Sequence, residues 1–272
     1  MRAALLVATL LLGGCSQLFL HPTREQALHP EKLGLAYEDV FLALGDGARL
    51  HGWFLPAKAA RGTILHLHGN GDNISSFIGA VHWLPARGYN VLLLDYRGYG
   101  RSNGVATIAG AHADAQLALR YLAARRGPGS ERLVVLGQSL GGSIGIYAVA
   151  HAAPPDRARI KGVISEGAFS SYSRIAREKM NALWLTWPLQ WPLSLLFSDE
   201  YSAEDALPQL GGIPLLLIHG DRDQVVPYSH SQRLNDRAAG RHELWTIAGG
   251  GHIDALTRNE WRERLMAWLD GL

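Results

Sequence analysis

The sequence predicts an α/β fold built on a mostly parallel β-sheet with helices on both faces. From residue 63 onward, short apolar segments alternate with segments of helical periodicity, and segments such as "VLLL" and "LLLI" are apolar at every position. Strands of a parallel sheet are buried on both faces and therefore read as continuous apolar runs. A chain of 272 residues with 47% hydrophobic and 18% charged residues is long enough for one such domain.

Eight strands and five helices are expected in this order along the chain. The first two strands, 37–44 and 50–55, are joined by Gly45-Asp46-Gly47, whose Asp-Gly is a hairpin signal, so they should form an antiparallel pair. The later strands are 63–68, 90–95, 133–136, 160–165, 214–219 and 243–247. The helices are 75–87, 109–126, 140–151, 229–239 and 253–269.

Residues 170–207 interrupt the alternation of strands and helices. Trp184, Trp187 and Trp191 have helical spacing, but Pro188 and Pro192 prevent one straight helix. We therefore expect a cap of two short helices inserted into the domain. Two roles remain open for the tryptophans: packing of the cap onto the sheet, or direct contact with lipid or substrate.

The N-terminus resembles that of an exported bacterial lipoprotein. Arg2 precedes an apolar run at 3–12, and Leu12-Gly13-Gly14-Cys15 is similar to a lipobox. This resemblance implies a signal peptide at 1–14, lipidation of Cys15, a tether at 15–36 and a domain at 37–272. Ser16 implies sorting to the outer membrane, in the bacterial cell envelope. The alternative is an uncleaved apolar anchor over 3–20.

The pattern G-x-S-x-G, typical of a nucleophilic serine, occurs twice in "GQSLGGSIG". In an α/β sheet the reactive groups follow the carboxyl ends of strands. Ser139 falls in the turn directly after the strand 133–136, whereas Ser143 falls one helical turn later. The register therefore selects Ser139, and Ser143 is expected to pack against the sheet.

A serine nucleophile needs a histidine as base and a carboxylate to orient that histidine. His252 is the best placed of the twelve histidines, because it follows the last predicted strand through Gly249-Gly250-Gly251. His66, His68 and His219 lie within or at the end of strands and are expected to pack or to make structural hydrogen bonds. Asp221 and Asp223 both follow the strand 214–219, so position alone leaves two candidate acids.

These motifs together resemble the α/β-hydrolase superfamily over about residues 37–272. The acid loop of that family often reads G-x-x-D-x-x-V-P, which "GDRDQVVP" matches with Asp223 as the acid. The segment "DYRGYGRS" at 95–102 is similar to a turn in the branch that includes serine aminopeptidase-like proteins and bacterial surface hydrolases. The resemblance implies that Asp221 serves its own turn.

A tetrahedral oxyanion also needs hydrogen-bond donors. The N–H of Leu140 follows the nucleophile at a helix N-terminus and is one expected donor. The second is implied by the family resemblance, in which the residue after His-Gly supplies it, and here that residue is Asn70. Asp95 and Glu166 are expected to be structural.

These residues lead us to expect a serine hydrolase that cleaves carboxylic esters or thioesters. We expect no cofactor and no metal, because no cluster of metal-ligand residues stands out. The expected partners are an acyl substrate, such as a lipid or acylated protein, and a membrane reached through Cys15, but no nucleic acid, since charges are nearly balanced. The alternatives are a serine peptidase or aminopeptidase, and a surface lipoprotein without catalytic activity.

Overall fold

One eight-stranded sheet runs through the protein. The computed structural model describes residues 19–45, 47–181, 190–194 and 197–272, without the side chains of 192 and 193. The strands are β1 (Glu38–Ala43), β2 (Arg49–Leu55), β3 (Gly62–Leu67), β4 (Tyr89–Leu94), β5 (Leu133–Gln138), β6 (Ile160–Glu166), β7 (Leu215–Gly220) and β8 (His242–Ile247).

The strand order is β1-β2-β4-β3-β5-β6-β7-β8. β2 pairs antiparallel with both β1 and β4, and every other neighbouring pair is parallel. This confirms the predicted mostly parallel sheet with an antiparallel N-terminal pair. Because β3 to β8 are parallel, their carboxyl ends share one edge, where the predicted reactive residues should gather.

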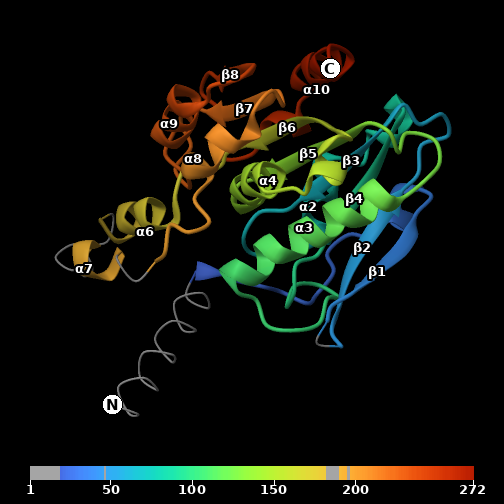
Figure 1. Cartoon of the computed structure of the whole chain (residues 1–272), viewed down its shortest axis with the longest axis horizontal. Helices are drawn as coiled ribbons and strands as arrows, with labels where there is room; N and C mark the ends of the chain where they lie inside the picture. Colours follow the sequence, from blue (N-terminus) through green and yellow to red (C-terminus); the bar gives the residue numbers. More distant parts are fainter. Residues whose placement is uncertain (1–18, 46, 182–189, 195–196) are drawn as a thin grey trace.

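Helices cover both faces of the sheet. The described helices are α2 (Ile74–Phe77), α3 (Ile108–Ala124), α4 (Leu140–Ala150), α5 (Pro154–Arg157), α6 (Tyr172–Asn181), α7 (Gln190–Ser194), α8 (Ala203–Ala206), α9 (Ser229–Arg237) and α10 (Asn259–Asp270). Figure 1 shows α3 and α4 side by side on one face. Their apolar residues form one buried cluster, and α2 and α10 contribute to a second cluster on the other face.

The expected helix at 75–87 is broken in the structure. Only α2 is α-helical there, and it is followed by two 3₁₀ turns, η2 (Ile78–Ala80) and η3 (Pro85–Arg87). Gly79 destabilises the helix and Pro85 cannot donate the hydrogen bond that would continue it. The final helix is also shorter than expected, because residues 255–257 form a separate 3₁₀ turn, η6 (Ala255–Thr257), before α10.

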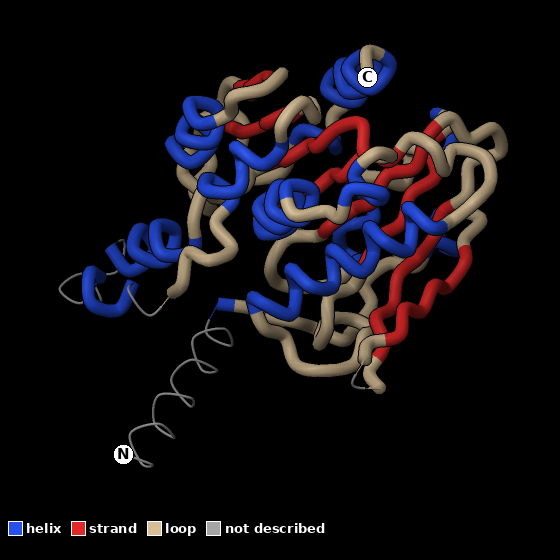
Figure 2. The backbone as a smooth tube through the Cα atoms, viewed as in Figure 1, coloured by secondary structure: helices blue, strands red, loops and turns tan. Residues whose placement is uncertain are grey.

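The region expected to form the cap contains α6, α7 and α8, followed by the 3₁₀ turn η5 (Leu207–Leu210). Figure 2 shows α6 and α7 standing apart from the sheet. At the other end of the described chain, a 3₁₀ turn, η1 (Pro30–Leu33), precedes β1. Among the residues described, no helix combines the length and the apolar character needed to span a bilayer.

Candidate active site

Ser139 occupies a sharp turn between β5 and α4. Its backbone has φ 52° and ψ −117°, a conformation that costs a residue with a side chain about 1–3 kcal/mol. A Cβ atom on Gly137 would overlap the carbonyl of Gly141, and one on Gly141 would overlap the carbonyl of Leu67. Glycine is therefore required on both sides of Ser139, which explains the motif in physical terms.

The two candidate serines have different environments. Ser139 borders a cavity at the sheet edge. Ser143 is fully buried inside α4, and its hydroxyl donates to the carbonyl of Phe169 at 2.6 Å. A hydroxyl committed to a buried carbonyl has no access to a substrate, so of the two serines only Ser139 borders the cavity.

The carboxylate of Asp223 lies against the imidazole of His252. His252 Nδ1 is 2.6 Å from Asp223 Oδ2, and the Asp223 side chain is fully buried. Asp221 instead accepts the N–H of Gly249 at 2.7 Å, so it braces the loop that carries the histidine. The structure thus brings together two of the predicted residues, Asp223 and His252.

A second histidine contacts the same carboxylate. His219 Nε2 lies 3.1 Å from Asp223 Oδ2 and 2.9 Å from the carbonyl of Val226. Both neighbours are acceptors, so Nε2 carries a proton, while Nδ1 lies 2.6 Å from the hydroxyl of Ser231. The sequence predicted a structural hydrogen bond for His219 but not this partner, because only the fold places Asp223 within reach of the strand end.

Asp223 is held in its ionised form. Burial alone would raise its pKa, but hydrogen bonds from His219, His252 and the N–H of Val226 outweigh burial and hold the pKa well below its usual range. The residue is therefore a carboxylate throughout the physiological pH range. A permanent negative charge beside His252 is what the orienting acid of a hydrolytic triad requires.

Ser139 and His252 border the same strand end. The N–H of Ser139 donates to the carbonyl of Glu166 at 2.8 Å. The ring of His252 packs on Gly167, the residue after Glu166, since a Cβ atom on Gly167 would lie 3.2 Å from His252 Cε1. Within the described residues, neither Ser139 Oγ nor His252 Nε2 has a hydrogen-bond partner.

The predicted oxyanion donors, Asn70 and Leu140, line the same cavity as Ser139. The loop after β3 approaches the nucleophile closely, because a Cβ atom on Gly69 would lie 3.3 Å from Ser139 Cβ. His68 supports this loop through a 2.7 Å contact between its Nδ1 and the carbonyl of Gly69. In the described part of the chain, the backbone N–H groups of Asn70 and Leu140 have no acceptor, so both remain available to a ligand.

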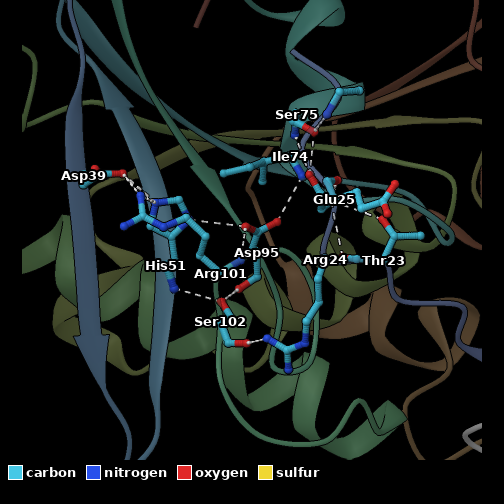
Figure 3. A network of polar contacts seen from close by, with 12 residues as sticks. Thr23, Arg24, Glu25, Asp39, His51, Ile74, Ser75, Asp95, Arg101 and Ser102 are labelled. Atoms are coloured by element: carbon cyan, nitrogen blue, oxygen red, sulfur yellow. Dashed lines mark hydrogen bonds and ion pairs between the residues drawn. The ribbon is translucent and has the colours of Figure 1, made fainter. Parts of the chain in front are cut away.

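Asp95 is enclosed in a polar network that Figure 3 shows. Its carboxylate accepts the N–H of Ile74 at 3.0 Å and lies 3.3 Å from His51 Nδ1. His51 Nε2 lies 2.7 Å from Asp39, which also pairs with Arg101. Asp95 thus fixes the start of α2 and the turn that follows β4, a structural role as the sequence predicts.

Glu166 links the two sides of the site below its surface. Its carboxylate accepts the Gln138 side-chain amide at 2.7 Å and the N–H of Ala255 at 2.8 Å. Burial raises the pKa of Glu166, partly offset by these hydrogen bonds. His66 contacts the other side of Gln138, with Nε2 3.1 Å from Oε1. Glu166 and His66 are fully buried and neither lines the cavity, so their hydrogen bonds support the structure of the site.

The cavity beside Ser139 has a volume of about 490 Å³. Most of its described lining is apolar, and Lys179 is the one permanently charged side chain in that lining. The lining residues are Phe19, His21, Asn70, Ser139, Leu140, Phe169, Ile175, Ala176, Lys179, Met180, Phe197, Val225 and Val226. A mainly apolar hollow that also contains a few polar groups suits an acyl chain.

Three further expectations concern the tryptophans of the cap, Cys15 and metal ligands. Trp191 on α7 is 64% exposed and stacks with the guanidinium of Arg177, 4.5 Å from its ring centre. Trp184, Trp187 and Cys15 lie outside the described residues. No group of three or more potential metal ligands occurs in the described parts of the chain.

Sequence comparison finds one family model and several curated relatives. The model described as "Serine aminopeptidase, S33" matches residues 58–201. The uncharacterized protein YfhR of Escherichia coli K12 is 37% identical over 225 residues, which cover 81% of this chain and 75% of that protein. The α/β-hydrolase domain-containing protein WAV2 of Arabidopsis thaliana is 33% identical over 244 residues, covering 85% and 77%.

Comparison with solved structures gives the same fold at lower identity. The Pyrococcus furiosus esterase Pf2001 superposes with a TM-score of 0.75 at 22% identity, covering 93% of this chain and 99% of the esterase. Acetyl xylan esterase 1 from Thermoanaerobacterium superposes with a TM-score of 0.68 at 17% identity, covering 86% and 83%. At these identities the similarity establishes the architecture, and the chemistry must be argued from the site.

Proposed function

The chain belongs to the serine aminopeptidase, S33, family of α/β hydrolases, and from that premise we propose that it is a serine hydrolase of carboxylic esters or thioesters. One observation carries the proposal. Ser139 lies in a strained turn on the wall of an apolar cavity and, like His252, contacts the end of β6, while His252 pairs with Asp223. This combination supplies a nucleophile, a base and an orienting acid.

The proposed reaction proceeds through an acyl-enzyme. Ser139 Oγ attacks the substrate carbonyl carbon while His252 Nε2 takes the hydroxyl proton, and the N–H groups of Asn70 and Leu140 bind the resulting oxyanion. The tetrahedral intermediate collapses, and His252 returns the proton to the leaving alcohol or thiol. A water molecule then attacks the acyl-enzyme by the same route, releasing the carboxylic acid and restoring Ser139.

The pairing of His252 with Asp223 supports these roles. Because Nδ1 faces the carboxylate, Nε2 is the nitrogen left to accept a proton from the nucleophile. The charge of Asp223 stabilises the imidazolium that forms. We expect the Ser139–His252 hydrogen bond to close when substrate binds, since such bonds are often long in free enzymes.

The cavity favours acyl substrates over aminoacyl substrates. An aminopeptidase needs a carboxylate to receive the substrate amino group, and none occurs in the described lining of the cavity. Three acids at the end of the cap have other partners: Asp199 accepts from Ser173, while Glu204 and Asp205 pair with Arg237. Peptidase activity is therefore the second candidate, supported by the family description.

We also propose that the protein is a lipoprotein of the bacterial outer membrane, anchored through Cys15. The support is the sequence around Cys15 and its position four residues before Phe19, which borders the cavity. An anchor so close to the cavity favours lipids or acylated proteins as substrates. Metabolic labelling with an alkynyl palmitate should mark the wild-type chain and not Cys15→Ser, and an unlabelled chain retaining residues 1–14 would support the uncleaved anchor instead.

A fluorophosphonate probe tests the enzyme proposal directly. It should label the wild-type protein, and Ser139→Ala should abolish labelling and lower kcat on a butanoyl nitrophenyl ester by about 10⁴-fold or more. Ser143→Ala is the matched control and should retain labelling if it folds. A folded wild-type protein that neither labels nor turns over esters or aminoacyl anilides would support the non-catalytic lipoprotein instead.

A further inference from the structure

The segment that precedes the domain, residues 19–27, lies against the active-site loops, and we name it the strap. Phe19, at its start, lines the cavity beside Ser139. The Phe19 ring packs edge-on against Phe169, with centroids 5.8 Å apart, and against Tyr172 at 5.4 Å. It also contacts Phe197 at 6.0 Å. The strap therefore contributes one ring to an aromatic cluster whose other rings come from the domain.

The strap also clamps the side chain of Asn70. The N–H of His21 donates to Asn70 Oδ1 at 3.0 Å, and Asn70 Nδ2 donates to the carbonyl of Phe19. Tyr99 and the N–H of Gly71 donate to the same Oδ1 at 3.0 Å and 2.9 Å. With both ends of its amide engaged, the Asn70 side chain has one orientation, which restrains the backbone of a residue that lines the cavity together with Ser139.

Further along, the strap is bonded to the two loops that support Asn70. Asn73 Nδ2 donates to the carbonyl of Glu25 at 2.7 Å, and the N–H of Gly100 donates to the carbonyl of Thr23 at 2.8 Å. Arg24 donates to the carbonyl of Ser102 at 3.2 Å. Figure 3 shows the strap residues beside Asp95, whose carboxylate binds the N–H of Ile74. These contacts join the strap to the loops at 69–75 and 95–102.

We propose that the strap is a working part of the active site, with Phe19 as a specificity-determining residue and Asn70 as its point of connection to the oxyanion site. The inference rests on the proposed hydrolase function. Phe19 limits the space open to the acyl chain. The backbone of Phe19 and His21 acts as a positioning element for the Asn70 N–H.

Phe19→Ala tests the wall. Removing the ring enlarges the cavity, so the ratio of kcat/KM for dodecanoyl to butanoyl nitrophenyl ester should rise by about tenfold or more. Phe41→Ala is the matched control, because Phe41 lies on β1, is 39% exposed and does not line the cavity. A Phe19→Ala profile equal to that of Phe41→Ala overturns the specificity role.

Binding in a Ser139→Ala background separates this inference from the proposed function. Calorimetry with intact dodecanoyl and butanoyl esters measures how the cavity accepts each acyl chain without turnover, and adding Phe19→Ala should shift the preference toward the longer acyl chain. If the wild-type protein fails to label or hydrolyse, the hydrolase proposal fails, yet this measurement still decides the role of Phe19.

Asn70→Ala tests positioning, because it keeps the backbone N–H and removes the clamp. We expect kcat for the acetyl ester to fall about 10- to 100-fold with KM changed less than about twofold, since the oxyanion forms only in the transition state. Tyr99→Phe removes one of the four hydrogen bonds and should give a smaller loss of the same kind. A rise in KM with unchanged kcat, in a variant with wild-type melting temperature, contradicts the positioning role.

Discussion

Two buried carboxylates at the carboxyl edge of the sheet have pKa values shifted in opposite directions. β6 and β7 pair in parallel, and Glu166 ends β6 while Asp223 follows β7. The pKa of Asp223 is held well below its usual range, whereas burial raises the pKa of Glu166. Position at the sheet edge does not decide which carboxylate serves the histidine.

The difference lies in the donors around each group. Asp223 faces two imidazoles, His219 and His252, and also accepts the N–H groups of Val225 and Val226. Glu166 accepts one side-chain amide and backbone N–H groups, which do not outweigh its desolvation. Hydrogen bonds from the two imidazoles favour the ionised form of Asp223, and an ionised carboxylate is the form that stabilises an imidazolium.

Among variants that test the difference between Asp223 and Glu166, Asp223→Asn is expected to have the largest effect on kcat. The amide keeps the shape of the side chain but no longer stabilises the imidazolium or selects its tautomer, so kcat should fall by about 10³–10⁴-fold. Steady-state hydrolysis of a butanoyl nitrophenyl ester measures this loss. Asp221→Asn is the neighbouring control, and a larger loss in that variant than in Asp223→Asn would transfer the acid role to Asp221.

His219 should give the next largest effect. His219→Leu removes the donor that lowers the pKa of Asp223, and the loss of a hydrogen bond to a charged group corresponds to about 10- to 100-fold in kcat. The acid limb of the pH profile of kcat/KM, which follows protonation of the base His252, should move to higher pH, because a carboxylate with one hydrogen bond fewer stabilises the imidazolium more strongly.

A conservative variant separates this positioning role from simple packing. His219→Gln retains an N–H donor and should recover part of the rate and of the profile. Loss of activity with an unshifted pH profile in His219→Leu would mean that His219 only packs.

The sequence was sufficient to predict residues that follow strand ends. The apolar pattern located β5, β7 and β8. Ser139 follows β5, Asp223 follows β7 and His252 follows β8. The proximity of Asp223 to His252 follows from parallel strands ending at one edge. Gly79 and Pro85 are residues that break helices, but the apolar pattern around them led to the prediction of one continuous helix at 75–87.

The strap could not be predicted, for a physical reason. Its hydrogen bonds to Asn70 use the backbone of Phe19 and His21, and any residue other than proline offers the same N–H and carbonyl. No side-chain pattern marks such contacts between residues about fifty positions apart. The hydrogen bond from His219 to Asp223 could not be predicted either, because nothing in the sequence distinguishes His219 from other polar residues at the end of a strand.

The smallest effect on rate is expected from Glu166→Gln, which tests the other half of the comparison. Glu166 reaches the site only through Gln138 and the N–H of Ala255, so kcat should change less than about threefold if these contacts persist. Gln138 can rotate its amide to meet the new donor, since burial lowers the pKa of His66 to about 3 and the neutral ring accepts either orientation. A loss comparable with that of Asp223→Asn would place Glu166 in the catalytic machinery.

The same variant should alter stability in a pH window that Asp223 does not affect. Below about pH 4.5 Glu166 is protonated in both states; as pH rises above that value the unfolded chain releases its proton first, so the free energy of unfolding falls until the folded pKa is reached. Asp223 has a lowered pKa, so its contribution is present above about pH 3.8 and lost only as pH falls further. Urea unfolding between pH 4 and 8 should therefore show a smaller decline for Glu166→Gln than for wild type, whereas parallel curves would mean that Glu166 ionises equally in both states.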